Sequence, residues 1–309
     1  MTIGLCVKNS ERTIRQSIES IAKQSYPLNL IQLIVVDGSS KDKTLPIIKK
    51  VTSKTSIQLE IHSDGGKGLG AARQIVVNNA KGRYIIFVDA DITIFSDFVR
   101  SHVKFMEADP DLGAAFGTPM FHEGPLVATI LSLATSTVGG GVGAGASICR
   151  SEALRQIGGF DTKIKGAAED RDLFVRLRLK GWQISVNETA KYFHEHRGDL
   201  YSFWAEQSWF GYGDHYFNHK YRNINNIWRN YPTEGSEGVS LTHALFGGSV
   251  DTIWHRLPIG EFIWGLELSS KAFKRTHKKL SFLILPQLIL GNIGWWVGFG
   301  KAHRNKYGH

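Results

Sequence analysis

Two aspartates separated by one alanine, Asp89 and Asp91, directly follow the apolar run Tyr84 to Val88. A buried strand normally passes into Gly, Asn or Ser at its turn. Two adjacent carboxylates repel each other unless a positive charge lies between them. Carboxylate oxygens are ligands that suit Mg2+ or Mn2+, and these ions also bind substrate phosphates. A D-x-D can also be a solvated turn, but after an apolar strand it predicts a divalent-cation site.

Two further groups of side chains could do chemistry. The stretch AAEDRDLFVRL contains Glu169, Asp170 and Asp172 near a predicted helix start. Carboxylates there could accept a proton in catalysis, although the helix dipole alone favours acidic residues at that position. His194 and His196 alternate in a strand-like register and are expected to face the same side. They could be metal ligands or a polar surface pair.

Alternating strand and helix patterns must position these groups. Apolar runs predict strands over residues 2–8, 31–40, 57–63 and 83–91, and amphipathic patterns predict helices over 10–24, 43–53 and 68–82, with Ser10 as an N-cap. Strands that alternate with helices indicate parallel crossovers and a layered α/β sheet. Asp37 and Asp89 stand at strand ends, so we expect them to converge on one crevice at the carboxyl edge of the sheet.

The second half of the chain is less regular. Residues 125–149 are uncharged and glycine-rich, and we interpret them as a buried strand-loop-strand region rather than a membrane span. A short helix over 151–159 follows. Residues 240–273 are rich in aromatic side chains and predict helices against the core or a membrane.

Length and composition indicate a globular protein with one large domain or one domain with appendages. The chain has 309 residues, of which 42% are hydrophobic and 21% charged. Cys6 and Cys149 are far apart in apolar contexts, which argues against a disulfide framework and for reducing surroundings. No signal-peptide pattern opens the sequence, so the soluble part is expected in the cytoplasm.

The positive charge is concentrated near the C-terminus. The net charge is +9, and residues 271–309 contain eight Lys or Arg and no Asp or Glu. This distribution argues against a nucleic-acid partner. The uncharged stretch 280–300 lies between two basic clusters and includes Trp295 and Trp296. Such a stretch could span a bilayer, lie in its interface or pack as a soluble helix; the first two would place the protein on a membrane.

Three blocks in order resemble the signatures of glycosyltransferase family 2, the inverting nucleotide-sugar transferases. They are IQLIVVDGSSKDKT, GKGLGAARQIVVNNAKGRYIIFVDADI and GGFDTKIKGAAEDRDLFVRLRLKGW. The resemblance covers about residues 1–215. It implies a single A-type glycosyltransferase domain with a Rossmann-like, mostly parallel sheet, divided into a nucleotide-sugar half (1–95) and an acceptor half (96–215). Residues 216–309 would then form a helical, membrane-associated extension.

The resemblance also implies roles for the donor-side residues. Asp37 would contact the nucleobase or ribose, Arg73 the nucleotide, and Asp91 with Asp89 the metal, Mn2+ or Mg2+, and the diphosphate-sugar. The family often has a second acidic residue where this sequence has Gly38, and this departure leaves UDP and GDP both open.

On the acceptor side, the family's E-D pair implies Asp170 as the general base and Glu169 as an acceptor-site or orienting residue, with Asp172 as the rival base. The H-x-H-R pattern aligns His194 with a family metal ligand, although His196 stays open. The Q-x-x-R-W pattern of processive synthases is absent after Gln207, which favours transfer of a single sugar.

The sequence therefore predicts a metal-dependent inverting glycosyltransferase at the cytoplasmic membrane face. It would move one sugar from a UDP- or GDP-sugar to a lipid-linked or cell-surface glycan acceptor. Alternatives are a polyprenyl (dolichyl) phosphate sugar synthase and a non-catalytic membrane scaffold with the same fold. A sugar nucleotidyltransferase would need a glycine-rich loop after the first strand, and VKNSER has none.

Overall fold

The computed structural model describes residues 1–138, 143–222 and 258–307. The chain divides into two compact units. The first comprises Met1–Met120, Gly140–Lys165 and Glu169–Glu195, and the second comprises Phe121–Gly139, Gly166–Ala168 and His196–His309. Residues 139–142, which include three glycines of the expected loop, and the first part of the expected aromatic helices, 240–257, lie outside the described residues. The functional division at residues 95 and 215 stays a prediction.

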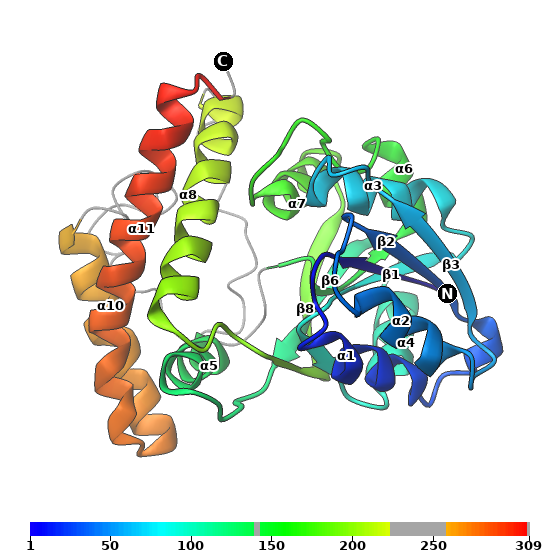
Figure 1. The fold of residues 1–309 in the computed structure, drawn as a ribbon, viewed down its shortest axis with the longest axis horizontal. Coiled ribbons are helices and arrows are strands. Elements are labelled where there is room, and N and C mark those ends of the chain that lie inside the picture. Colours follow the sequence, from blue (N-terminus) through cyan, green and yellow to red (C-terminus); the bar gives the residue numbers. More distant parts are fainter. Residues whose placement is uncertain (139–142, 223–257, 308–309) are drawn as a thin grey trace. The chain divides into compact units, whose positions relative to one another are not determined.

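The first unit is built around an eight-stranded mixed sheet with the order β3-β2-β1-β4-β7-β6-β8-β5 (Figure 1). Strands β1 to β4 run parallel, as do β6 and β8, whereas β7 is antiparallel to β4 and β6, and β5 to β8. The four strands predicted from the first 91 residues are confirmed. The strand bounds are Thr2–Val7 (β1), Gln32–Asp37 (β2), Gln58–Ser63 (β3), Tyr84–Asp89 (β4), Ile92–Ile94 (β5), Leu112–Pro119 (β6), Ala146–Arg150 (β7) and Gln183–His194 (β8).

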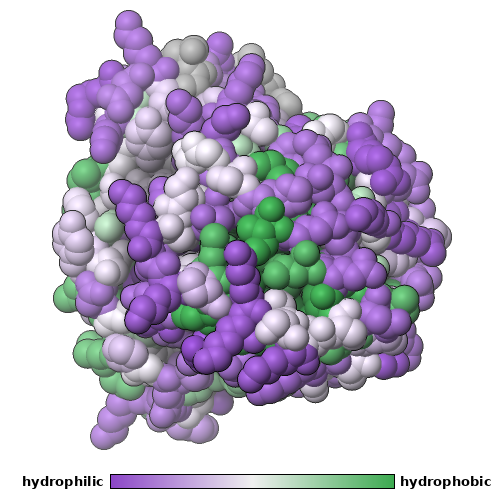
Figure 2. All heavy atoms as spheres, turned by 45° about the vertical axis from the view of Figure 1, so that its right-hand side comes forward, coloured by the Kyte–Doolittle hydropathy of each residue, from purple (hydrophilic) through white to green (hydrophobic). Residues whose placement is uncertain are grey.

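Helices cover both faces of this sheet (Figure 1). One face carries α1 (Ile14–Ala22), α2 (Thr44–Thr52) and α4 (Phe98–Ala108), and the other carries α3 (Leu69–Asn79), α6 (Ser151–Gln156) and α7 (Glu169–Leu179). A 3-10 turn, η1 (Leu28–Leu30), leads into β2. Because both faces are covered, the parallel strands read as continuous apolar runs, and every residue of β2 is buried. Most of the surface visible in Figure 2 is hydrophilic, with apolar side chains near the centre of the view and others along its left edge.

Helix α1 begins later than predicted. It starts at Ile14, and Ser10 is not its N-cap: the Ser10 carbonyl accepts the N–H groups of Thr13 and Ile14 in a preceding turn. The Ser10 hydroxyl donates to the Lys8 carbonyl, and no side-chain hydrogen bond caps the helix.

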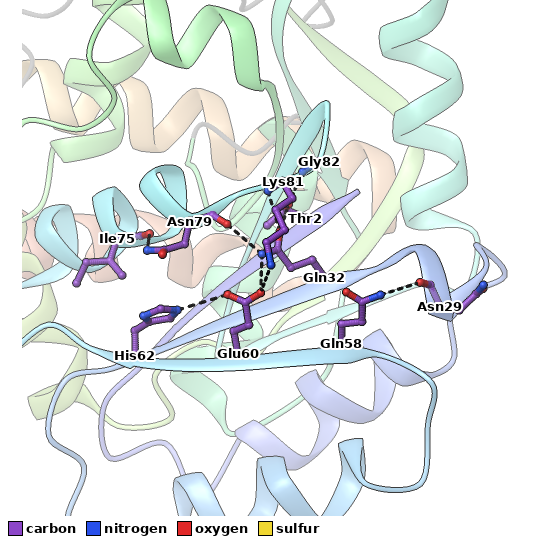
Figure 3. A network of polar contacts seen from close by, with 10 residues as sticks. All are labelled: Thr2, Asn29, Gln32, Gln58, Glu60, His62, Ile75, Asn79, Lys81 and Gly82. Carbon is purple, nitrogen blue, oxygen red and sulfur yellow. Dashed lines mark hydrogen bonds and ion pairs between the residues drawn. The ribbon is translucent and has the colours of Figure 1, made fainter.

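A buried glutamine ties the strands together at the edge opposite the predicted site (Figure 3). Gln32 Oε1 accepts hydrogen bonds from the Thr2 hydroxyl and the Lys81 N–H, and its Nε2 donates to Glu60 and to the Asn79 carbonyl. The amide thus connects β1, β2, β3 and the segment before β4. Satisfying a buried amide fully in this way fixes the register of the parallel strands.

The prediction of a strand-loop-strand region over residues 125–149 is wrong in its first part. Residues Leu126–Val138 form helix α5, whereas the strand predicted at the end of the region is present as β7. The glycines begin only after Val138, so the preceding residues are free to be helical. The hydroxyls of Thr135 and Thr137 donate to the Leu131 and Leu133 carbonyls one turn earlier, so both hydroxyl donors are satisfied within the helix.

The second unit contains α5, α8 (Leu200–Tyr221), α10 (Pro258–Thr276) and α11 (Ile284–Arg304), with the 3-10 turn η3 (Lys279–Leu283). Helices α8 and α11 lie side by side (Figure 1). A side chain at Gly211 would collide with the Trp295 carbonyl, and one at Gly298 with the Ser208 carbonyl, so glycines permit the close approach. By length and composition, one described helical stretch, Lys279–Arg304, could cross a membrane.

Candidate active site

The carboxyl ends of β2 and β4 lie on either side of β1. Asp37 pairs in register with Val7, and Asp89 with Cys6. The two aspartates are therefore separated by two strand spacings, roughly 10 Å of backbone. Both oxygens of Asp37 accept the Ser40 N–H, at 3.2 and 3.1 Å, which fixes the turn after β2. The expected convergence of Asp37 and Asp89 on one sheet edge is thus present.

The second aspartate of the D-x-D pattern lies beside a histidine. Asp91 Oδ1 is 3.5 Å from His194 Nε2, because β5 and β8 pair with Ile92 opposite His194. Strand β8 ends at His194, and His196 does not continue its register. The His196 ring instead lies 3.3 Å from the Thr135 hydroxyl. The structure therefore brings His194 to the Asp91 carboxylate, whereas His196 lies beside Thr135 within the second unit.

Asp89 has a different partner. Its Oδ1 lies 2.9 Å from the Arg73 guanidinium, and Arg73 also forms an ion pair with Glu169. Arg73 and Glu169 are each 2% exposed, whereas the Asp89 side chain is 36% exposed. One buried cation thus connects the end of β4 to the start of α7. The nucleotide-binding role expected for Arg73 stays a prediction, and the observed contacts of Arg73 are with carboxylates.

Burial shifts the titration of this cluster. It raises the pKa of Glu169 to about 8, although Arg73 counteracts the shift. Among the described residues, Glu169 Oε2 has no hydrogen-bond partner, so the ionised form is incompletely compensated. Burial opposes ionisation of Arg73 as well, but Asp89 and Glu169 raise the pKa of Arg73 above its ordinary value. Glu169 is buried against the Arg73 guanidinium, so it is suited to orienting Arg73 rather than to accepting a proton from an acceptor.

Two aspartates on α7 differ in access. Asp170 is only partly buried, and its carboxylate accepts the N–H groups of Ala144 at 3.2 Å and Arg171 at 2.7 Å. Asp172 is fully buried and bonds Arg176, with 2.7 Å between Oδ2 and Nε. Asp172 therefore stabilises the helix start, which leaves Asp170 as the carboxylate that an acceptor could reach.

The donor set suits a hard divalent ion only in part. Among the described residues, no group of three or more His, Cys, Asp and Glu side chains is placed to hold a metal. Asp91 and His194 nevertheless present one carboxylate oxygen and one imidazole nitrogen 3.5 Å apart, a spacing that one ion could bridge. Mg2+ and Mn2+ commonly take few protein ligands and complete their shell with water and substrate phosphates. The pair fits such an ion, while Asp89 is engaged by Arg73.

Two residues of this region, Ala144 and Gly145, carry no signal of a site in the sequence. The Asp89 N–H donates to the Gly145 carbonyl at 3.0 Å, directly beside the Ala144 contact with Asp170. The glycine cluster indicated only a loop, because contacts with residues 26 and 56 positions away leave no local pattern. The ion pair of Arg73 and Glu169, 96 positions apart, was equally invisible.

Known proteins resemble this chain in sequence and in fold. Residues 2–133 match the family Glycosyl transferase family 2. A poly(ribitol-phosphate) beta-glucosyltransferase of Bacillus spizizenii is 31% identical over 209 residues, covering 63% of this chain and 32% of its own length. The UDP-Glc:alpha-D-GlcNAc-diphosphoundecaprenol beta-1,3-glucosyltransferase WfaP of Escherichia coli is 34% identical over 109 residues, covering 35% of this chain and 42% of its own length. The chain thus spans less than half the length of these relatives.

Among solved structures, mannosyltransferase PcManGT from Pyrobaculum calidifontis, in complex with GDP-Man and Mn2+, superposes with a TM-score of 0.65 at 15% identity, over 99% of this chain and 87% of its own. Staphylococcus aureus TarS 1-349 in complex with UDP-GlcNAc gives a TM-score of 0.50 at 16% identity, over 98% of this chain and 91% of its own. At such identities these likenesses establish the fold, which is the A-type glycosyltransferase fold expected from the sequence. The sequence matches assign residues 2–133 to Glycosyl transferase family 2, and relatives of the same kind resemble the chain beyond that range.

Proposed function

We propose that this protein is an inverting glycosyltransferase that moves a single sugar from a nucleotide-diphosphate sugar to a lipid-linked or cell-surface glycan acceptor. The observation that carries the proposal is that two successive residues of one loop contact Asp89 and Asp170. Asp89 ends a strand at the sheet edge where nucleotides bind in such folds. Asp170 presents a partly exposed carboxylate from the start of α7, and successive residues of one loop contact both aspartates.

Each residue then has a definite task. Asp37 would bind the nucleobase or ribose, and Asp170 would take the proton of the acceptor hydroxyl as its oxygen attacks the anomeric carbon opposite the leaving diphosphate. The Ala144 and Arg171 N–H groups hold the Asp170 carboxylate in place for that attack. Glu169, through Arg73, keeps Asp89 beside the donor. Asp91 and His194 would hold Mn2+ or Mg2+, which when bound stabilises the charge of the departing diphosphate.

Position 38 does not decide which nucleobase the donor carries. Gly38, where the family often has an acidic residue, lies against the Lys8 side chain, and a Cβ there would be 3.2 Å from Lys8 Cβ. An acidic side chain would have to displace Lys8. Solved relatives in this fold hold GDP-Man or UDP-GlcNAc, so both UDP- and GDP-sugars are donors to test.

The test is calorimetric titration of UDP and of GDP into the protein, with and without Mn2+, beside Asp91→Asn. We expect metal-dependent binding of one nucleotide, weakened by at least tenfold in Asp91→Asn. Nucleotide binding that is equally tight in the absence of metal would refute the metal site. A folded protein that binds neither nucleotide would refute the transferase and support the scaffold alternative.

Asp170 separates the proposal from a polyprenyl phosphate sugar synthase. A phosphate acceptor is already ionised and needs no base, whereas a hydroxyl acceptor does. We expect Asp170→Asn to lower transfer to a hydroxyl acceptor by roughly 10²–10⁴-fold. Transfer to polyprenyl phosphate that survives this substitution would favour the synthase.

We further propose that the protein works at the cytoplasmic membrane surface through α11. Exposed Ile289, Ile293 and Val297 form one stripe along the helix, and exposed Lys301 and Arg304 continue it. The opposite face packs on other helices of the same unit. An apolar stripe that ends in cations fits the interface of an anionic bilayer. The two free cysteines, Cys6 and Cys149, accord with a reducing compartment.

The packing of α11 favours an interfacial position over a span. Its buried face includes Gln287, which donates to the Val127 carbonyl, and Trp295, which donates to Asp214 on α8. A spanning α11 would have to carry the Asp214 carboxylate and the polar groups of α8 into the bilayer, at a cost of several kcal/mol.

Vesicle flotation tests this position. The protein should float with phosphatidylglycerol vesicles and much less with phosphatidylcholine vesicles, and Ile293→Asp should reduce flotation at least tenfold. Leu30→Asp is the matched control, since Leu30 is an equally exposed aliphatic residue of the first unit (55% against 54%). Equal flotation of both variants would refute the role of the stripe.

A further inference from the structure

The loop that enters β7 contacts both aspartates of the proposed reaction, Asp89 through its backbone N–H and Asp170 through its carboxylate. Gly145 accepts the Asp89 N–H through its carbonyl, and Ala144 donates its N–H to Asp170 Oδ2. Asp89 ends β4 and Asp170 lies in the first turn of α7, 81 residues later. Two consecutive backbone units thus set the separation between the donor-side carboxylate and the base.

The Asp89 carboxylate occupies the space that a side chain at position 145 would fill. A Cβ built on Gly145 would lie against Asp89 Oδ2 and Cγ, well inside the 3.0 Å that real Cβ atoms essentially never breach. Gly145 does not have a positive φ, so its backbone conformation is open to any residue. The requirement for glycine is therefore steric, and it concerns the Asp89 carboxylate.

We infer that Ala144 and Gly145 are positioning residues that fix Asp89 relative to Asp170, and that Gly145 in particular keeps room for the Asp89 carboxylate. This inference rests on the proposed function. Transfer requires the anomeric carbon, held on the Asp89 side, and the acceptor hydroxyl, held at Asp170, to meet at about 3–3.5 Å. A displacement of about 1 Å can cost about 100-fold in rate.

The neighbouring glycine provides a matched control. A Cβ on Gly143 would lie 3.5 Å from Asp170 Oδ2, which is an ordinary van der Waals contact, and Gly143 also lacks a positive φ. Gly143→Ala and Gly145→Ala make the same chemical change two residues apart. Gly145→Ala is expected to fold, because the group in its way is the end of a side chain that can rotate.

The experiment measures nucleotide release from UDP-glucose, UDP-N-acetylglucosamine and GDP-mannose, together with UDP and GDP binding and thermal unfolding. We expect Gly145→Ala to lower kcat about 100-fold while nucleotide affinity stays within threefold, since Asp37 is untouched, and Gly143→Ala to keep wild-type kcat within threefold. In an Asp89→Ala background, Gly145→Ala should have no further effect, because no carboxylate remains to be displaced.

The outcomes separate the two proposals. Wild-type kcat in Gly145→Ala, or the same loss with and without the Asp89 carboxylate, would overturn the positioning role. Wild-type protein that binds neither UDP nor GDP would overturn the proposed function itself. A lower unfolding midpoint with unchanged kcat would show that Gly145 serves stability alone, which also contradicts the inference.

Discussion

Removal of Arg73 should destabilise the protein in a pH-dependent way. Arg73 and Glu169 are each 2% exposed, and breaking a buried ion pair from one side costs about 3–5 kcal/mol. In Arg73→Met the Glu169 carboxylate loses its counter-charge, so the free energy of unfolding should fall by that amount at pH 9. Arg12→Met is the matched control, because the pair of Arg12 with Glu195 is exposed, 62% and 32%, and contributes about 0–1 kcal/mol.

The pH dependence follows from the Glu169 titration. Burial raises the folded-state pKa of Glu169 from 4.5 to about 8, so the folded state holds a proton that the unfolded state releases above pH 4.5. The resulting stability is complete below pH 4.5 and is lost as the pH rises to about 8. Without Arg73 the folded-state pKa lies higher still, and the loss continues beyond pH 8. The difference between wild type and Arg73→Met should therefore be small near pH 6 and grow above pH 8.

Urea unfolding followed by circular dichroism from pH 5 to 9 measures this difference. Glu169→Gln removes the titrating group. In that background, Arg73→Met should lower the free energy of unfolding by less than half as much as it does in the wild-type protein. A cost below 1 kcal/mol at pH 9, equal to that of Arg12→Met, would refute the buried ion pair. A cost that does not change with pH, or that Glu169→Gln leaves intact, would refute the assigned role of Glu169.

Two further predictions concern packing and thiol reactivity. Gly298→Ala should lower the thermal midpoint, through overpacking of roughly 1–3 kcal/mol against the Ser208 carbonyl. Gly300→Ala is the control, because the nearest contact of its Cβ would be the Arg304 guanidinium at 3.8 Å. This substitution should raise the thermal midpoint, since alanine stabilises a helix by about 0.5–1 kcal/mol relative to glycine. Equal midpoints of the two variants would contradict the close packing of α8 and α11. Cys149 is fully buried, and burial raises the pKa of its thiol to about 12, so a thiol reagent at pH 8 should label Cys149 only after unfolding in guanidinium. Rapid labelling of Cys149 in the native protein would refute its burial.

Local patterns were sufficient to predict the first four strands. The strands over residues 2–91 and the helix start at Glu169 follow from periodicity and residue preference, which depend on neighbours in the chain. The same reasoning predicted a strand-loop-strand region over 125–149, whose first part is helix α5, because an apolar run before a glycine cluster fits either element. Only packing within the second unit distinguishes the two.

The sequence by itself determined the fold class, the resemblance to glycosyltransferase family 2 and the acidic residues at the strand and helix ends, since these reside in short blocks of the chain. The tertiary structure decided which of these charges meet. It paired Arg73 with Glu169 and Asp89, placed His194 beside Asp91, buried Asp172 and left Asp170 partly exposed. Contacts between residues many positions apart depend on sheet order and helix packing, and the free energy of a charge depends on its burial. A local sequence pattern contains neither quantity. The sequence therefore indicates only a loop glycine at position 145, whereas the fold shows that a side chain there would collide with the Asp89 carboxylate.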